Sequence, residues 1–82
     1  MDIIDLAPGE VAPEDADRIL LVELPAGVCG VSGMVRTRDA RSEPIVMVSP
    51  NLLPSLNEAR AVGRAWAEKN GATRLFVETP GA

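Results

Sequence analysis

Short apolar runs, separated by glycine, proline and charged residues, fill the first half of the chain. The segments Arg18–Leu24, Val28–Arg38 and Pro44–Val48 are rich in valine, leucine and isoleucine and have the length of β-strands. Residues 3–6 could add a short edge strand. Residues 39–43 read as the turn between the second and third of the longer strands. The pattern therefore predicts a series of short strands.

A helical pattern follows Pro54. Ser55 and Glu58 have the spacing of a capping box, and Gly71 can take the left-handed conformation that ends a helix. Between them, small and apolar residues recur every three or four positions on one face: Leu56, Ala59, Val62, Gly63, Trp66 and Ala67. A last strand is predicted at Arg74–Thr79. The fold class expected is α+β, in the order strand, strand, strand, helix, strand, with one main helix on one face of a three- to four-stranded, largely antiparallel sheet.

The predicted strands carry apolar side chains on both faces of this sheet. Neighbouring residues of a strand point to opposite faces, and the apolar runs here are nearly continuous rather than alternating. One helix can cover only one face, so the second face must meet the N-terminal arm, a second copy of the chain or a partner protein. The side chains expected on this possible dimer or partner face are Leu20, Val22, Leu24, Val46, Val48 and Phe76.

Composition limits the classes of protein that this chain can represent. Its 82 residues predict a single domain, 1–82, in which 1–17 form an acidic N-terminal arm. With no histidine and one cysteine, Cys29, the chain cannot form an internal disulfide or a Cys/His zinc site, and it lacks the commonest general base. We therefore predict a non-enzymatic protein with no metal or cofactor. The single cysteine and the lack of a signal or membrane-spanning pattern favour the cytoplasm.

Charge is unevenly distributed along the chain. The first 25 residues hold seven acids and one base, Arg18, whereas the rest of the chain has a small positive net charge. An acidic surface favours a basic partner through complementary potentials, although a solvated acidic arm is the simpler alternative. The candidate partner-binding residues are Asp2, Asp5, Glu10, Glu14, Asp15, Asp17 and Glu23.

Two other features suggest binding chemistry. Arg36, Arg38 and Arg41 cluster around the predicted hairpin and could contact phosphates, but the pI near 4.6 and the scarcity of aromatic residues argue against direct nucleic-acid binding. The glycines of residues 27–33 match neither a dinucleotide-binding nor a phosphate-binding loop. We interpret them instead as a strand that needs glycine for a bulge or for close packing.

Two resemblances extend this interpretation. The strand–helix–strand layout of residues 43–79, with its Ala-rich helix followed by Gly71-Ala72 and a hydrophobic strand, is similar to the ending of small bacterial and phage proteins of the β-β-α-β type. In size, in the acidic run of residues 10–17 and in its lack of catalytic residues, the chain also resembles phage-encoded anti-CRISPR inhibitors. That resemblance implies an inhibitor whose acidic residues occupy a basic nucleic-acid-binding surface of a partner complex in the host cytoplasm. The alternatives are a bacterial homodimer of unknown role and a small nucleic-acid-binding module that uses the arginine hairpin of residues 36–41.

Overall fold

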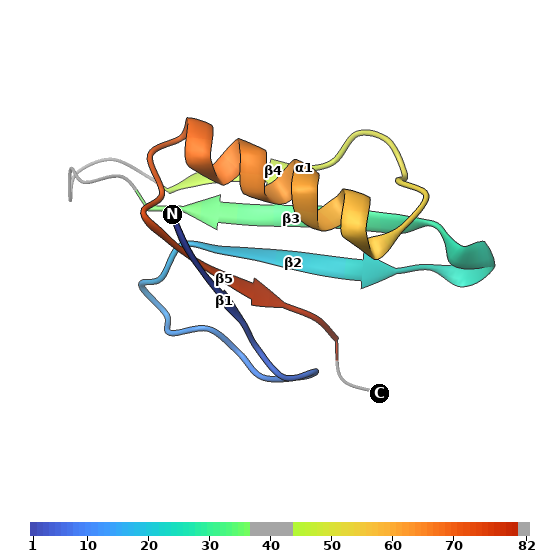
Figure 1. Cartoon of the computed structure of the whole chain (residues 1–82), viewed down its shortest axis with the longest axis horizontal. Helices are drawn as coiled ribbons and strands as arrows, with labels where there is room; N and C mark the ends of the chain where they lie inside the picture. Colours follow the sequence, from blue (N-terminus) through green and yellow to red (C-terminus); the bar gives the residue numbers. More distant parts are fainter. Residues whose placement is uncertain (37–43, 81–82) are drawn as a thin grey trace.

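Within the residues that the computed structural model describes, 1–36 and 44–80, five strands form one sheet (Figure 1). Its order is β1-β5-β2-β3-β4, and the elements along the chain are β1 (Asp2–Asp5), β2 (Arg18–Glu23), the short 3-10 helix η1 (Pro25–Gly27), β3 (Cys29–Val35), β4 (Ile45–Val48), α1 (Leu56–Lys69) and β5 (Arg74–Glu78). The predicted α+β class and the single helix of the C-terminal half are confirmed. The short edge strand expected at residues 3–6 is present as β1, and it brings the sheet to five strands instead of the predicted three or four.

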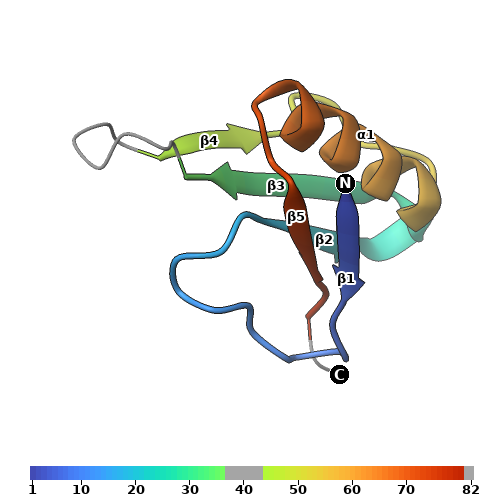
Figure 2. The same cartoon turned by 60° about the vertical axis from the view of Figure 1, so that its left-hand side comes forward.

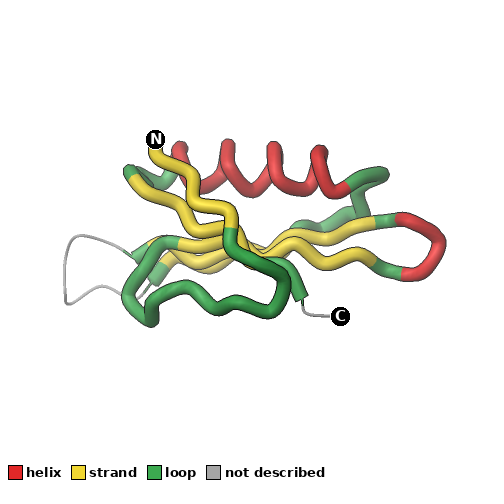
Figure 3. The backbone as a smooth tube through the Cα atoms, turned by 60° about the horizontal axis from the view of Figure 1, so that its bottom comes forward, coloured by secondary structure: helices red, strands yellow, loops and turns green. Residues whose placement is uncertain are grey.

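The sheet is mixed rather than largely antiparallel. β2, β3 and β4 pair antiparallel, whereas β5 lies between β1 and β2 and is parallel to both. Two crossovers produce these parallel pairs: residues 6–17 connect β1 to β2, and α1 connects β4 to β5. We call residues 6–17 the crossover loop. Figure 3 shows α1 on one face of the sheet and this loop on the other.

The opposite placement of the two crossovers follows from their handedness. Connections between parallel strands are almost always right-handed. The crossover loop runs from the β1 edge inward, and α1 runs in the reverse direction, from the β4 edge toward β5. Right-handed connections that run in opposite directions must lie on opposite faces, as Figure 2 also shows. The helix therefore covers one face, and among residues 1–36 and 44–80 the crossover loop is the segment that lies on the other.

The core lies between α1 and the sheet, mainly over β2 and β3. Its fully buried residues include Ile19, Val31 and Leu75, together with the helix residues Ala59 and Ala67. The predicted helix ends are confirmed: the Ser55 hydroxyl accepts the Glu58 N–H at 3.2 Å, and Gly71 has a φ of +90°. The buried stripe is narrower than predicted, because Leu56 and Val62 stay 36% and 40% exposed while the small residues contact the sheet.

Two glycines allow the helix to lie close to the sheet. A Cβ at Gly63 would be 2.7 Å from Ile19 Cδ1 and 2.9 Å from Val31 Cγ2. A Cβ at Gly33 would be 2.6 Å from Cζ3 of Trp66. The prediction that β3 needs glycine for close packing is confirmed at this position, where the indole occupies the space above the strand.

The turn predicted at residues 39–43, with Arg38 and Arg41, lies outside the described residues.

In the described part of the chain, no helix has the length and apolar character needed to cross a membrane.

Candidate interaction surface

The sheet face opposite α1 is only partly covered. On this face, the crossover loop reaches β5: the Ala12 N–H donates to Glu78 Oε2 at 3.0 Å, and Pro13 and Ala16 lie beside Phe76. The loop does not extend over β3 and β4, since it ends where β2 begins. We call the uncovered part the open face. Its side chains come from β2, β3, β4 and the segment after β4: Leu20, Val22, Ser32, Met34, Val46, Val48 and Leu52.

Apolar side chains on the open face are unusually accessible. Val46, Val48 and Leu52 are 68%, 77% and 58% exposed. The two valines point away from the helix because Met47, between them, points toward the core. Alternation along β4 therefore presents both valines to solvent.

Two shallow hollows lie on the open face. The first has a volume of about 340 Å³ and is floored by Leu20, Met34, Val46 and Val48. The second, about 270 Å³, is lined by Val22, Val48 and Leu52, and both share Ser32 and Val48. Because the hollows adjoin, they form one extended, mainly apolar depression across three strands.

Charged residues stand at the border between the open face and the crossover loop. Arg18 and Glu78 line the first hollow. The Arg18 guanidinium donates to the Glu14 carbonyl at 2.9 Å, while Glu78 accepts the Ala12 N–H. Both side chains thus join the margin of the hollow to the loop. The open face is apolar in its centre and charged along this one border.

The structure separates the residues predicted for the dimer or partner face. Leu20, Val22, Val46 and Val48 come together on the open face. Phe76 lies on the same side of the sheet but beside the crossover loop, where it lines a hollow with Pro13 and Ala16. Leu24 follows β2 at the start of η1 and is 37% exposed.

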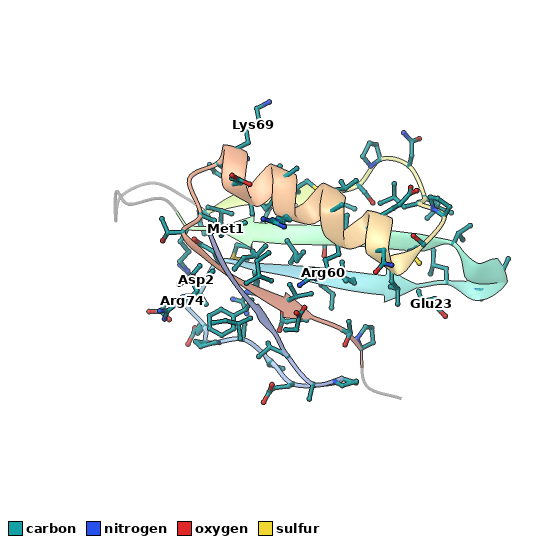
Figure 4. All side chains as sticks on the ribbon, viewed as in Figure 1. Met1, Asp2, Glu23, Arg60, Lys69 and Arg74 are labelled. Atoms are coloured by element: carbon teal, nitrogen blue, oxygen red, sulfur yellow. The ribbon has the colours of Figure 1, made fainter. Side chains whose placement is uncertain are left out.

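The predicted acidic partner-binding residues do not form one surface. Figure 4 shows Asp2 and Glu23 at opposite ends of the sheet. Asp5 forms a two-point contact with Arg60, with 2.8 Å between Oδ2 and Nη2 and 3.2 Å between Oδ1 and Nε. Asp17 Oδ1 accepts the Arg36 N–H at 2.8 Å. Asp5 and Asp17 are therefore engaged in contacts within the fold.

The remaining acids lie on the crossover loop. Glu10 accepts the N–H of Ala7 at 3.2 Å and closes a local turn. Glu14 and Asp15 are exposed, and Asp15 lines the hollow beside Phe76. Glu14 and Asp15 are thus exposed neighbours on the loop that lies on the same side of the sheet as the open face. Asp2 is also exposed on that side, at the far edge strand β1.

Cys29 does not have the environment of a reactive thiol. Its side chain is 1% exposed in the core, and burial raises its pKa above the ordinary range of a thiol, with a smaller contribution from the negative charge of Glu23. The thiol therefore stays protonated at neutral pH, whereas nucleophiles and metal ligands need the thiolate. Across residues 1–36 and 44–80, no group of three or more cysteine, aspartate or glutamate side chains is placed to hold a metal ion.

Sequence reasoning missed Leu52 and the Asp5–Arg60 contact. Leu52 lies in a proline-bracketed segment without strand or helix periodicity, so its place beside Val22 depends on the bridge between Cys29 and Leu53. Arg60 and Asp5 are 55 positions apart, and no local pattern pairs them. They meet because Asp5 is on the helix-side face of β1, which pairing with β5 brings into the sheet.

No family model, no curated protein and no solved structure matches this chain.

Proposed function

We propose that the protein is a non-enzymatic interaction domain that binds a protein partner through its open face. The observation that supports this most directly is the exposure of Val46, Val48 and Leu52 on one continuous apolar depression. A contiguous exposed apolar surface with a charged border is typical of protein-binding sites. Burial of each such side chain by a partner is worth roughly 1–2 kcal/mol.

The charged border beside the crossover loop indicates which kind of partner surface would be complementary. Glu14 and Asp15 are exposed there: the Glu14 carbonyl accepts from Arg18, which lines the first hollow, and Asp15 lines the hollow beside Phe76. A partner surface with an apolar centre and basic residues on one side would be complementary to this arrangement. The charges would mainly steer and select the partner, while apolar contact would supply most of the affinity.

The specific form of this proposal is an inhibitor of the anti-CRISPR type. Glu14 and Asp15 would take the place of nucleic-acid phosphates on a basic surface of a partner complex. Asp5 and Asp17 are held in contacts within the fold, so a charge reversal that includes them would also disturb the structure. A test of phosphate mimicry therefore changes Glu14 and Asp15 alone.

Site-specific photo-crosslinking tests the binding surface. A photoreactive amino acid at position 48 should crosslink one partner in cells of the native host, and the same group at position 62 should not. Val62 serves as the control because it is a partly exposed valine on the flank of α1, on the helix-covered side of the sheet. The identified partner is then purified, and its affinity is measured for Val48→Lys and Val62→Lys. We expect Val48→Lys to weaken binding at least tenfold. Equal crosslinking at both positions, or equal affinities, would contradict the proposal.

Competition with nucleic acid tests the inhibitor form. If the purified partner binds DNA or RNA, the protein should displace that nucleic acid, and displacement should weaken as salt concentration rises. The double variant Glu14→Lys/Asp15→Lys should lose displacement, whereas Glu68→Lys on the exposed side of α1 should retain it. Undiminished displacement by the double variant would exclude mimicry of phosphates by Glu14 and Asp15. It would not contradict binding through the open face, which the crosslinking experiment tests.

A further inference from the structure

The two edges of the sheet differ in how they are protected. β1 carries Asp2 and Asp5, and Asp5 is paired with Arg60 of α1. Charges on an edge strand are a common way to prevent pairing with other chains. β4 has the sequence Ile-Val-Met-Val, with no charge and no proline within it, and in the described part of the chain no strand lies beyond it. The β4 edge therefore lacks the protection that β1 has.

Backbone hydrogen bonds identify which groups of β4 point outward. The N–H of Leu24 donates to the Val28 carbonyl, which places the even-numbered residues of β3 toward β2. Cys29 exchanges hydrogen bonds with Leu53, and Ser49 donates to Val31, so the odd-numbered residues of β3 bond toward β4. Antiparallel ladders alternate, so Ile45 and Met47 face β3. The N–H and C=O groups of Val46 and Val48 then point away from the sheet.

We infer that β4 pairs antiparallel with β4 of a second copy, about a two-fold axis at Met47. In this register, Val46 of one copy lies opposite Val48 of the other, and each such pair exchanges two N–H···O=C hydrogen bonds. Every outward N–H of β4 then has an acceptor. The valines pack across the junction on one face, and cross-strand contacts between β-branched residues stabilise such pairs.

The ends of β4 favour a second copy over an unrelated strand. Pro44 precedes β4 and Pro50 follows Ser49, and in the register centred on Met47 the two prolines lie opposite each other. Neither has an N–H, so no donor is left unpaired where the pairing stops. No like charges meet, since the segment from Pro44 to Pro50 holds no charged residue. The edge is thus complementary to itself in length, charge and hydrogen bonding.

The size of the contact predicts a weak dimer. A stable interface of standard size buries about 800 Å² per partner, roughly a seventh of the 5380 Å² that this chain exposes. One four-residue strand and its neighbouring side chains cover less than that. We therefore expect dissociation constants in the micromolar range or above.

The dimer would join the open faces of the two copies into one surface of six strands, β2-β3-β4 from each. A role of this six-stranded surface in partner binding rests on the function proposed above. The pairing of β4 with β4 does not depend on that function. The six-stranded surface would have a crossover loop, with Glu14 and Asp15, along each outer border.

Concentration-dependent hydrogen exchange tests the pairing directly on the unaltered chain. The amides of Val46 and Val48 should exchange rapidly in dilute solution and become protected as dimer forms, measured in parallel by sedimentation equilibrium. The amide of Met47 should be protected at all concentrations because it bonds to β3 within one copy. A monomer at millimolar concentration, or a dimer with unprotected Val46 and Val48 amides, would overturn the inference.

Two variants separate edge pairing from packing of the open faces. Val48→Pro removes an outward N–H and no bond to β3, so it should abolish dimerisation while circular dichroism shows a folded monomer. Leu20→Lys changes the open face away from the edge, so dimerisation should persist while binding of the crosslinked partner is lost. A dimer abolished by Leu20→Lys and retained by Val48→Pro would refute edge pairing. If Val48→Pro does not fold, the exchange measurement on the unaltered chain decides.

Discussion

Gly63 provides the most demanding test of how α1 packs on the sheet. In an exposed helix interior, replacing glycine by alanine stabilises a protein by about 1 kcal/mol, because glycine loses more backbone entropy on folding. At position 63 the added methyl would lie 2.7 Å from Ile19 Cδ1 and 2.9 Å from Val31 Cγ2. Both strand residues are fully buried, so neither can move into solvent.

The two effects oppose each other, and their magnitudes decide the sign. Overpacking by a methyl group in a tight core costs roughly 1–3 kcal/mol, and two contacts below 3 Å place this site in the upper half of that range. After the gain in helix propensity, we expect Gly63→Ala to lower the free energy of unfolding by about 1–2 kcal/mol. For a domain of this size, the melting temperature should fall by roughly 5–15 °C.

Urea unfolding followed by far-ultraviolet circular dichroism measures this change. Ala65→Gly, on the exposed side of the same helix, reports the propensity difference alone and should cost about 1 kcal/mol. Ile19→Val removes the nearest methyl and should cost about 0.5–1.5 kcal/mol in the native background but less in the Gly63→Ala background. A Gly63→Ala protein more stable than the native chain would refute the close approach of α1 to β2 and β3.

Three further predictions follow from other contacts. Gly33→Ala should destabilise the fold by about 1–3 kcal/mol and shift Trp66 fluorescence to longer wavelength, because the indole must move toward solvent; an unchanged emission maximum would contradict this packing. Asp5→Asn should cost less than about 1 kcal/mol in urea unfolding, with a smaller effect at high salt, since the contact with Arg60 is exposed. Burial raises the pKa of Cys29, so as the pH rises through the ordinary range of a thiol the unfolded chain loses this proton before the folded chain does, and stability relative to Cys29→Ala should fall there; a constant difference across that range would argue against burial of the thiol.

Local sequence determined the secondary structure of this protein. The spacing of small and apolar residues between Ser55 and Gly71 predicts α1 because side chains three and four residues apart share a helix face. Strands β2 to β5 follow from runs of branched residues bounded by turn-forming residues. The presence of apolar side chains on both sheet faces was also predictable, since alternation is a property of any strand.

Only the tertiary structure decided the order of the strands and which segment covers each face of the sheet. Residues 2–5 become an edge strand parallel to β5, and this pairing depends on a contact some seventy positions away along the chain. The same arrangement turns Asp5 toward Arg60 and places Phe76 beside the crossover loop, so residues that look alike in sequence have different roles. The number of acids in a segment does not show which of them share a surface. Here the seven acids of the first 25 residues predicted a larger acidic surface than the structure contains. The open face exists because two right-handed crossovers run in opposite directions, and the shorter one stops at β2.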